Sequence, residues 1–214
     1  EGINTVIRGA RLGCVYMRSC PPAGGKTRMA TGDACKFAVP YYYDKATEQF
    51  IYTGMCEPTA IFSTEMPVDE IQTLVISAVS KVNEEHILLG TYEPGEIERV
   101  EQAIEYIKAS PLYIIHIPDF SIEDIKNLVK KYHREYSVRY FFFDYIHTSL
   151  RLMAEVNGKS GGGLKEHQLL TVFITELKTL CQQLDVFMFT ASQLNGEAQN
   201  AQYKDQNLIA GAKS

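Results

Sequence analysis

The fold of this chain is decided by one stretch of sequence, Cys14-Val15-Tyr16-Met17-Arg18-Ser19-Cys20-Pro21-Pro22-Ala23-Gly24-Gly25-Lys26-Thr27. Its beginning, residues 14–18, is an apolar run of strand length, and residues 20–25 form a turn rich in glycine and proline. Residues 26–38 then show the apolar spacing of a helix. A strand that enters a helix through a tight turn is the repeating unit of α/β proteins with parallel sheets.

The turn matches a Walker A loop, in which Gly-Lys-Thr opens a helix directly after a strand. Backbone N–H groups at such a turn converge on phosphate oxygens, the lysine meets the β- and γ-phosphates, and the threonine hydroxyl holds Mg²⁺. The residues expected to bind the nucleotide are Ala23, Gly24, Gly25, Lys26, Thr27 and Arg28. Because Cys20 stands where the motif usually begins with glycine, a glycine-rich turn without a nucleotide is the alternative. The flanking strand and helix favour nucleotide binding.

Short apolar runs alternate with amphipathic segments along the rest of the chain. Strands are predicted at 59–64, 113–117, 139–144 and 186–190, and helices at 67–82, 94–107, 121–132 and 165–184. Unbroken apolar strands linked by helices predict an α/β fold with a doubly wound, mainly parallel sheet and ligands at the carboxyl ends of its strands. We expect one domain over residues 1–214, a hairpin insertion at 40–57 and a mobile glycine-rich loop at 155–166.

The composition excludes several classes of protein. The 214 residues are 45% hydrophobic and 22% charged, as in ordinary globular domains. The net charge of −5 argues against a polybasic binder, although a local basic channel is compatible with it. No apolar run approaches the roughly 18 residues of a membrane span. Five scattered cysteines without metal-ligand spacing fit reduced thiols, so we expect a cytoplasmic protein with no membrane contact.

Polar residues at predicted strand ends are the ones that would complete an ATPase site. Asp144 ends an apolar strand, as a Walker B aspartate that binds Mg²⁺ does, and Glu65 is placed to polarise the attacking water. Gln193 follows the strand at 186–190 and is placed to sense the γ-phosphate. Each could instead be an ordinary polar residue that leaves a strand. We expect Lys26, Thr27, Glu65 and Asp144 to converge from three neighbouring strand ends.

These motifs together resemble the RecA-like ATPase domain of DnaB-type replicative helicases, phage and prophage members included. The resemblance covers about residues 10–214 and rests on four ordered blocks: residues 22–27, Phe62-Ser63-Thr64-Glu65-Met66, Asp144-Tyr145-Ile146-His147 and Ser192-Gln193-Leu194-Asn195. It implies a P-loop NTPase fold. It assigns catalysis to Glu65, Lys26 and Gln193, with Gln193 coupling the nucleotide to the rest of the motor, and it assigns Mg²⁺ to Thr27 and Asp144.

The resemblance also implies a function: a homohexameric ring that binds ATP and Mg²⁺ between subunits and translocates on single-stranded DNA during replication. Residues 155–166 and 194–207 would be the channel loops, and Lys159, Lys165 and Lys204 would contact DNA phosphates. Each of these lysines could equally belong to a solvated surface. Primase and a helicase loader are the further partners that the resemblance implies.

The chain departs from the family pattern at several points. His147 stands where the family commonly has glutamine, and residues 40–57 are long for the family. The arginine finger and the last strands would follow Ser214, so a truncated carboxyl end is expected. Two alternatives stay open: a RecA-, KaiC- or RadA-like ATPase of recombination or signalling, and a nucleotide-dependent scaffold for replication partners.

Overall fold

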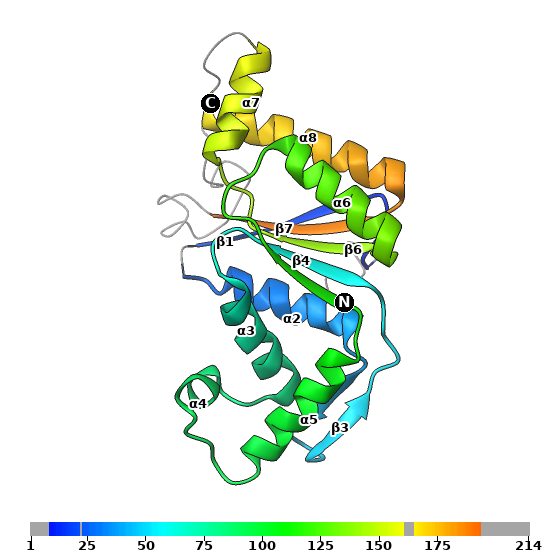
Figure 1. Cartoon of the computed structure of the whole chain (residues 1–214), viewed down its shortest axis with the longest axis vertical. Coiled ribbons are helices and arrows are strands. Elements are labelled where there is room, and N and C mark those ends of the chain that lie inside the picture. The colour runs from blue at the N-terminus through cyan, green and yellow to red at the C-terminus, as the bar shows by residue number, and fades with distance from the viewer. Residues whose placement is uncertain (1–8, 22, 161–164, 194–214) are drawn as a thin grey trace, which may run out of the picture.

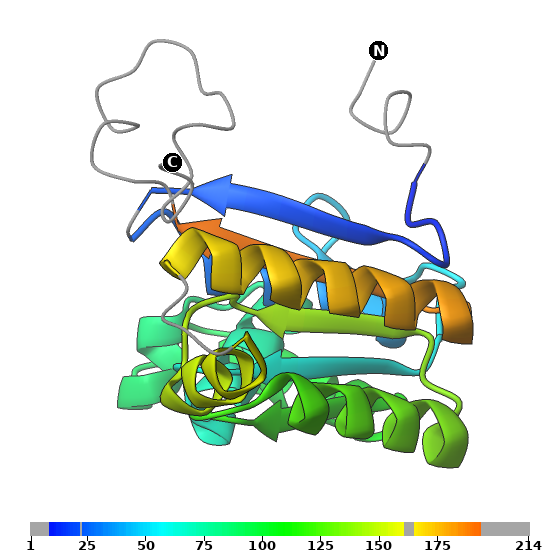
Figure 2. The same ribbon diagram turned by 90° about the horizontal axis from the view of Figure 1, so that it is seen from above.

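A five-stranded parallel sheet forms the centre of the molecule (Figure 1). The structure is a computed structural model, and it describes residues 9–21, 23–160 and 165–193. In spatial order the strands are β1 (Val15–Cys20), β7 (Phe187–Gln193), β6 (Tyr140–Asp144), β4 (Thr59–Ser63) and β5 (Leu112–His116). Every neighbouring pair is parallel, and the arrowheads of β1, β7 and β6 lie at the same edge (Figure 2). The predicted α/β sheet is confirmed.

Helices cover both faces of this sheet (Figure 1). One face carries α2 (Lys26–Ala38), α3 (Val68–Ser80) and α5 (Glu96–Lys108), with the short α4 (Glu84–Leu89) beyond α3. The other face carries α6 (Ile122–Tyr136), α7 (Leu150–Ser160) and α8 (Glu166–Leu184). Within the described ranges, no helix combines the length and the apolar character that crossing a membrane requires.

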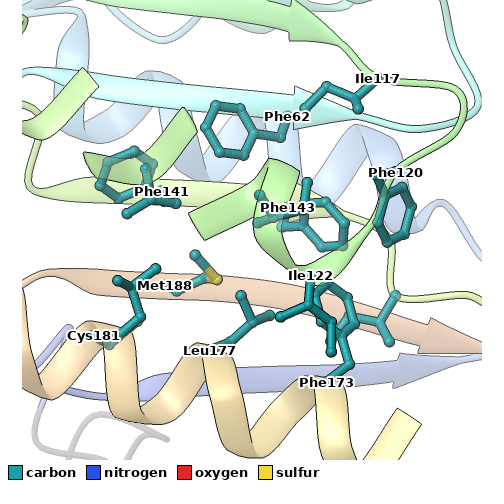
Figure 3. Close-up of a cluster of buried hydrophobic side chains, with 14 of the residues drawn as sticks. Phe62, Ile117, Phe120, Ile122, Phe141, Phe143, Phe173, Leu177, Cys181 and Met188 are labelled. Carbon is teal, nitrogen blue, oxygen red and sulfur yellow. The ribbon is translucent and has the colours of Figure 1, made fainter. Parts of the chain in front are cut away.

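Aromatic side chains of the strands fill the space on both sides of the sheet. Phe141 and Phe143 of β6 point toward α8, where Phe143 packs against Phe173 (Figure 3). Phe142, between them in sequence, points to the opposite face and packs beneath α2. Successive side chains of a strand alternate between faces, so an unbroken apolar run marks a strand buried on both sides.

The strands β1 and β7 run further than the apolar pattern predicts. The predicted strands end at residues 18 and 190, whereas the pairing continues through Ser19 with Ser192 to Cys20 with Gln193. The polar ends of these strands are paired through the backbone, which no hydrophobic pattern records. This extension carries Gln193 to the same level as the start of the Walker A turn.

The expected mobile loop at 155–166 is wrong for the residues that the structure describes there. Helix α7 continues through Ser160, and α8 begins at Glu166. Leu152 and Val156, one turn apart, are buried in the core beneath α7. Packing of this apolar stripe outweighs the low helix propensity of Gly158, which is exposed. Residues 161–164 lie outside the described ranges.

Residues within the segment 40–57 form an antiparallel hairpin. Its strands are β2 (Tyr41–Asp44) and β3 (Gln49–Tyr52). The hairpin rests on α5, because Tyr41 stacks on Tyr106 with ring centroids 4.3 Å apart. Phe50 meets the same ring edge-on at 5.2 Å.

Helix α6 begins with a capping box. The Ser121 hydroxyl accepts a hydrogen bond from the Asp124 N–H at 3.1 Å, and the Asp124 carboxylate accepts one from the Ser121 N–H at 2.8 Å. We expect Ser121→Ala to lower the free energy of unfolding by about 1 kcal/mol, because the first turn loses an acceptor. Urea denaturation measures this, with Thr179→Ala on the exposed side of α8 as the control. Equal stability of the two variants would contradict the capping role.

Candidate functional site

The carboxyl edge of the sheet gathers the residues that the sequence points to. The ends of β1 and β7 pair Cys20 with Gln193, and the ends of β4 and β6 pair Ser63 with Asp144. Glu65 lies two residues after Ser63 in the sequence. The strand β7 lies between β1 and β6. The expectation that the site is carried by three neighbouring strands is therefore wrong, since only β6 and β4 are neighbours.

The turn between β1 and α2 requires glycine at two positions. The Gly24 N–H donates to the Pro21 carbonyl at 3.0 Å, and a Cβ added at Gly24 would lie 2.9 Å from that oxygen. Gly25 has a φ of 74°, in the left-handed region that glycine adopts without strain.

The first turn of α2 is open to an anion. The helix begins at Lys26 with no side-chain cap and no acidic residue in its first turn. The first N–H groups of a helix have no partner within the helix, and its dipole makes this end positive. The turn and the start of α2 therefore have the geometry of a phosphate-binding site.

We expect Gly24→Ala to weaken ATP binding about 10-fold or more, because a methyl group there forces the turn away from Pro21. Titration with a fluorescent ATP analogue measures the dissociation constant. Gly32→Ala is the matched control on α2, since a Cβ there meets no atom within 4 Å. If both variants bind like the wild type, the turn does not hold the phosphates.

Asp144 lies at the centre of the site and is 3% exposed. Burial raises the pKa of its carboxyl group, and a hydrogen bond from the Thr27 hydroxyl lowers it. The charge of Glu65 raises this pKa and the charge of Lys26 lowers it, and the net effect is upward. Residues from two other segments, the start of α2 and the residues after β4, therefore surround this one carboxylate.

The pair of Asp144 and Thr27 fits a magnesium ion. The Asp144 Oδ1 atom is buried and has no hydrogen-bond partner among the described residues. A buried acceptor without a partner is costly, and a cation is one group that satisfies it. Mg²⁺ in nucleotide sites takes one or two protein oxygens and completes its shell with phosphate and water.

Thr64 fixes the end of β4 against the end of β6. Its N–H and its hydroxyl both donate to the Asp144 carbonyl, at 2.9 and 3.1 Å. Its hydroxyl oxygen also lies 3.4 Å from His147 Nδ1. These contacts set the position of Glu65, the next residue, relative to Asp144.

Tyr145 belongs to the site, although we did not predict it from the sequence. The Lys26 ammonium lies 4.4 Å from the centre of its ring. Burial is the main reason that the pKa of Tyr145 is raised to about 12, and the interaction of its hydroxyl with Glu65 is the second reason. The available signal was its place directly after Asp144, in a block that we used only for the aspartate.

Other predicted residues lie elsewhere or cannot be placed by their side chains. Arg28 points away from the turn, and its guanidinium lies 2.6 Å from a carboxylate oxygen of Glu84 on α4. Lys165 is exposed at the start of α8. Lys159 is in α7, but its side chain and that of Gln193 are outside the described part of the structure, as are Lys204 and residues 194–207.

Comparison with known proteins identifies relatives along most of the chain. Residues 1–208 match the family described as DnaB-like helicase C terminal domain. The chain is 35% identical to the SPbeta prophage-derived uncharacterized protein YorI of Bacillus subtilis (strain 168), over 98% of this chain and 42% of YorI. It is 29% identical to the replicative DNA helicase DnaB of Leifsonia xyli subsp. xyli (strain CTCB07), over 90% of this chain and 37% of that helicase. The chain thus spans less than half the length of these two relatives.

Solved structures share the fold. A DnaB-like replicative helicase, studied together with its interactions with primase, has a TM-score of 0.71 and 16% identity, over 95% of this chain and 44% of that one. The ATPase domain of G40P has a TM-score of 0.69 and 17% identity, over 93% of this chain and 63% of that one. With the Walker A turn and the acidic residues at one sheet edge, the match over residues 1–208 shows that this chain belongs to the family of DnaB-like helicase C-terminal domains.

Proposed function

We propose that this domain is the ATPase motor of a replicative-type DNA helicase. It hydrolyses ATP with Mg²⁺ between the subunits of a homohexameric ring and translocates on single-stranded DNA. The observation that carries the proposal is the convergence of Lys26, Thr27 and Glu65 on the buried Asp144 carboxylate. Membership of the DnaB-like family supports the same function.

The reaction assigns one task to each of these side chains. Lys26 and the N–H groups at the start of α2 hold the β- and γ-phosphates. Thr27 and Asp144 would hold Mg²⁺, which supplies positive charge against the charge that develops on the phosphates. Glu65, which is exposed, orients a water molecule. It takes a proton from this water as the water oxygen bonds to the γ-phosphorus, the bond to the bridging oxygen breaks, and ADP leaves.

We assign the DNA contacts to three lysines of the expected channel loops. Lys159 and Lys165 flank the connection between α7 and α8, and Lys204 lies in the segment 194–207. Gln193, which ends β7 beside the Walker A turn, would couple the nucleotide to that segment. Primase and a helicase loader are the protein partners that we propose, since a structural relative was studied with primase.

The proposal is tested by measuring nucleotide binding and hydrolysis with and without DNA. We expect ATP binding that requires Mg²⁺ and hydrolysis that is stimulated by oligo-dT. A protein that does not bind ATP would contradict the proposal. Hydrolysis without any effect of DNA would favour a signalling ATPase, and partner capture that needs Lys26 but not Glu65 would favour a nucleotide-dependent scaffold.

We expect Lys165→Ala to weaken binding of oligo-dT and to reduce the slope of log affinity against log salt by about 0.7, the value for one phosphate contact on a single strand. Fluorescence anisotropy at several salt concentrations measures the slope. Lys178→Ala is the control, because Lys178 is also exposed on α8 but lies further along the helix. An unchanged slope for Lys165→Ala would remove this lysine from the DNA path.

A further inference from the structure

Tyr145 lies between the two residues of opposite charge that the proposed reaction uses. The Lys26 ammonium lies over its ring, 4.4 Å from the centroid. The Glu65 carboxylate lies close enough to the hydroxyl at the far end of the same ring to raise the pKa of Tyr145. One side chain therefore contacts both the proposed phosphate lysine and the proposed catalytic acid.

The charge of Lys26 acts on the Asp144 carboxylate, yet Lys26 forms no ion pair with another described residue. In a partly buried site a direct bond between the ammonium and a carboxylate would be strong. Such a bond would occupy Asp144, which is needed for Mg²⁺, or Glu65, which is needed for the attacking water. The face of an aromatic ring attracts an ammonium group without occupying either carboxylate.

Tyr145 is itself held by its backbone, so it can act as a fixed support. Its N–H donates to the Thr64 hydroxyl oxygen at 3.3 Å, and its carbonyl oxygen lies 3.3 Å from His147 Nδ1. The His147 ring lies beside the Tyr145 ring, with centroids 5.4 Å apart. These contacts tie Tyr145 to the ends of both β4 and β6.

We propose that Tyr145 is a positioning residue of the ATPase site. Its ring keeps Lys26 beside the phosphate position and away from the carboxylates, and its hydroxyl orients Glu65 toward the attacking water. The inference rests on the proposed function, because it assigns roles within ATP hydrolysis.

Two substitutions separate the roles of the ring and the hydroxyl. Tyr145→Phe keeps the ring, so we expect the dissociation constant of ATP to stay within about twofold while kcat falls about 10-fold, from the loss of one hydrogen bond to a charged group. Tyr145→Leu also removes the ring, so we expect the same fall in kcat together with a dissociation constant about 5-fold higher. Tyr140→Phe, at the opposite end of β6, is the control and should behave like the wild type.

The measurements are a fluorescent ATP titration and steady-state hydrolysis, with circular dichroism to check folding. A wild-type kcat for Tyr145→Phe would overturn the role of the hydroxyl, and a wild-type dissociation constant for Tyr145→Leu would overturn the role of the ring. Tyr145→Met replaces the leucine variant if that variant does not fold. A purely structural role would instead change both constants in the phenylalanine variant. If the wild type itself neither binds nor hydrolyses ATP, the proposed function is wrong, and the role of Tyr145 is overturned with it.

Discussion

Glu65→Gln is expected to lower ATP turnover about 10²- to 10⁴-fold, the usual contribution of a general base, while ATP still binds. Glutamine has nearly the same shape as glutamate but does not take a proton from water. Glu65 follows the end of β4, contacts Tyr145 and acts electrostatically on Asp144. Its exposed side chain can therefore reach both solvent and the phosphate site.

Phosphate release and a fluorescent ATP titration, made on the same samples, separate turnover from binding. Glu70→Gln is the matched control, because Glu70 is exposed in the first turn of α3, five positions further along the chain. If Glu65→Gln hydrolyses ATP at the wild-type rate, another residue activates the water. If it loses binding as well, Glu65 belongs to the binding site and its catalytic role is unsupported.

Lys26→Ala is expected to weaken ATP binding about 100-fold or more, because the phosphates lose at least one hydrogen bond from a charged donor in a partly enclosed site. The substitution also removes the positive charge that lowers the pKa of Asp144, so this carboxyl group becomes harder to ionise. Binding of Mg²⁺ should fall with binding of ATP for that reason.

The matched control for this variant is Lys36→Ala, near the other end of α2, where the lysine pairs with Asp33 at the surface. Titration with a fluorescent ATP analogue, with and without Mg²⁺, measures the effect, and thermal unfolding shows whether the fold is intact. A folded Lys26→Ala protein with wild-type affinity would show that the phosphates bind somewhere other than the Walker A turn.

The loop expected at 155–166 is instead the end of α7 as far as Ser160, and glycine content and packing explain the difference. The run of glycines at 158 and 161–163 is typical of a loop, and it is a purely local signal. The helix forms because Leu152 and Val156 reach the core under α7 and α8, a contact between distant segments. Helix propensity is a weak effect that packing of this kind overrides.

The sequence by itself determined the β–turn–α unit and the acidic residues at the strand ends. The helix predicted over 26–38 is α2, with the same bounds, because the glycine turn and the apolar spacing are local properties. Parallel strands share one carboxyl edge, so naming Glu65 and Asp144 as strand-end residues was enough to predict that the charge of one acts on the other.

Only the tertiary structure decided how the side chains around that edge are paired. Arg28 contacts Glu84, 56 residues away in sequence, and leaves the phosphate turn that its position in the motif suggested. Tyr145 follows β6 and contacts both Lys26, which follows β1 on the far side of β7, and Glu65, which follows the neighbouring β4. Such pairings depend on the order of strands and on packing between segments distant in sequence, and a local pattern of residues contains neither.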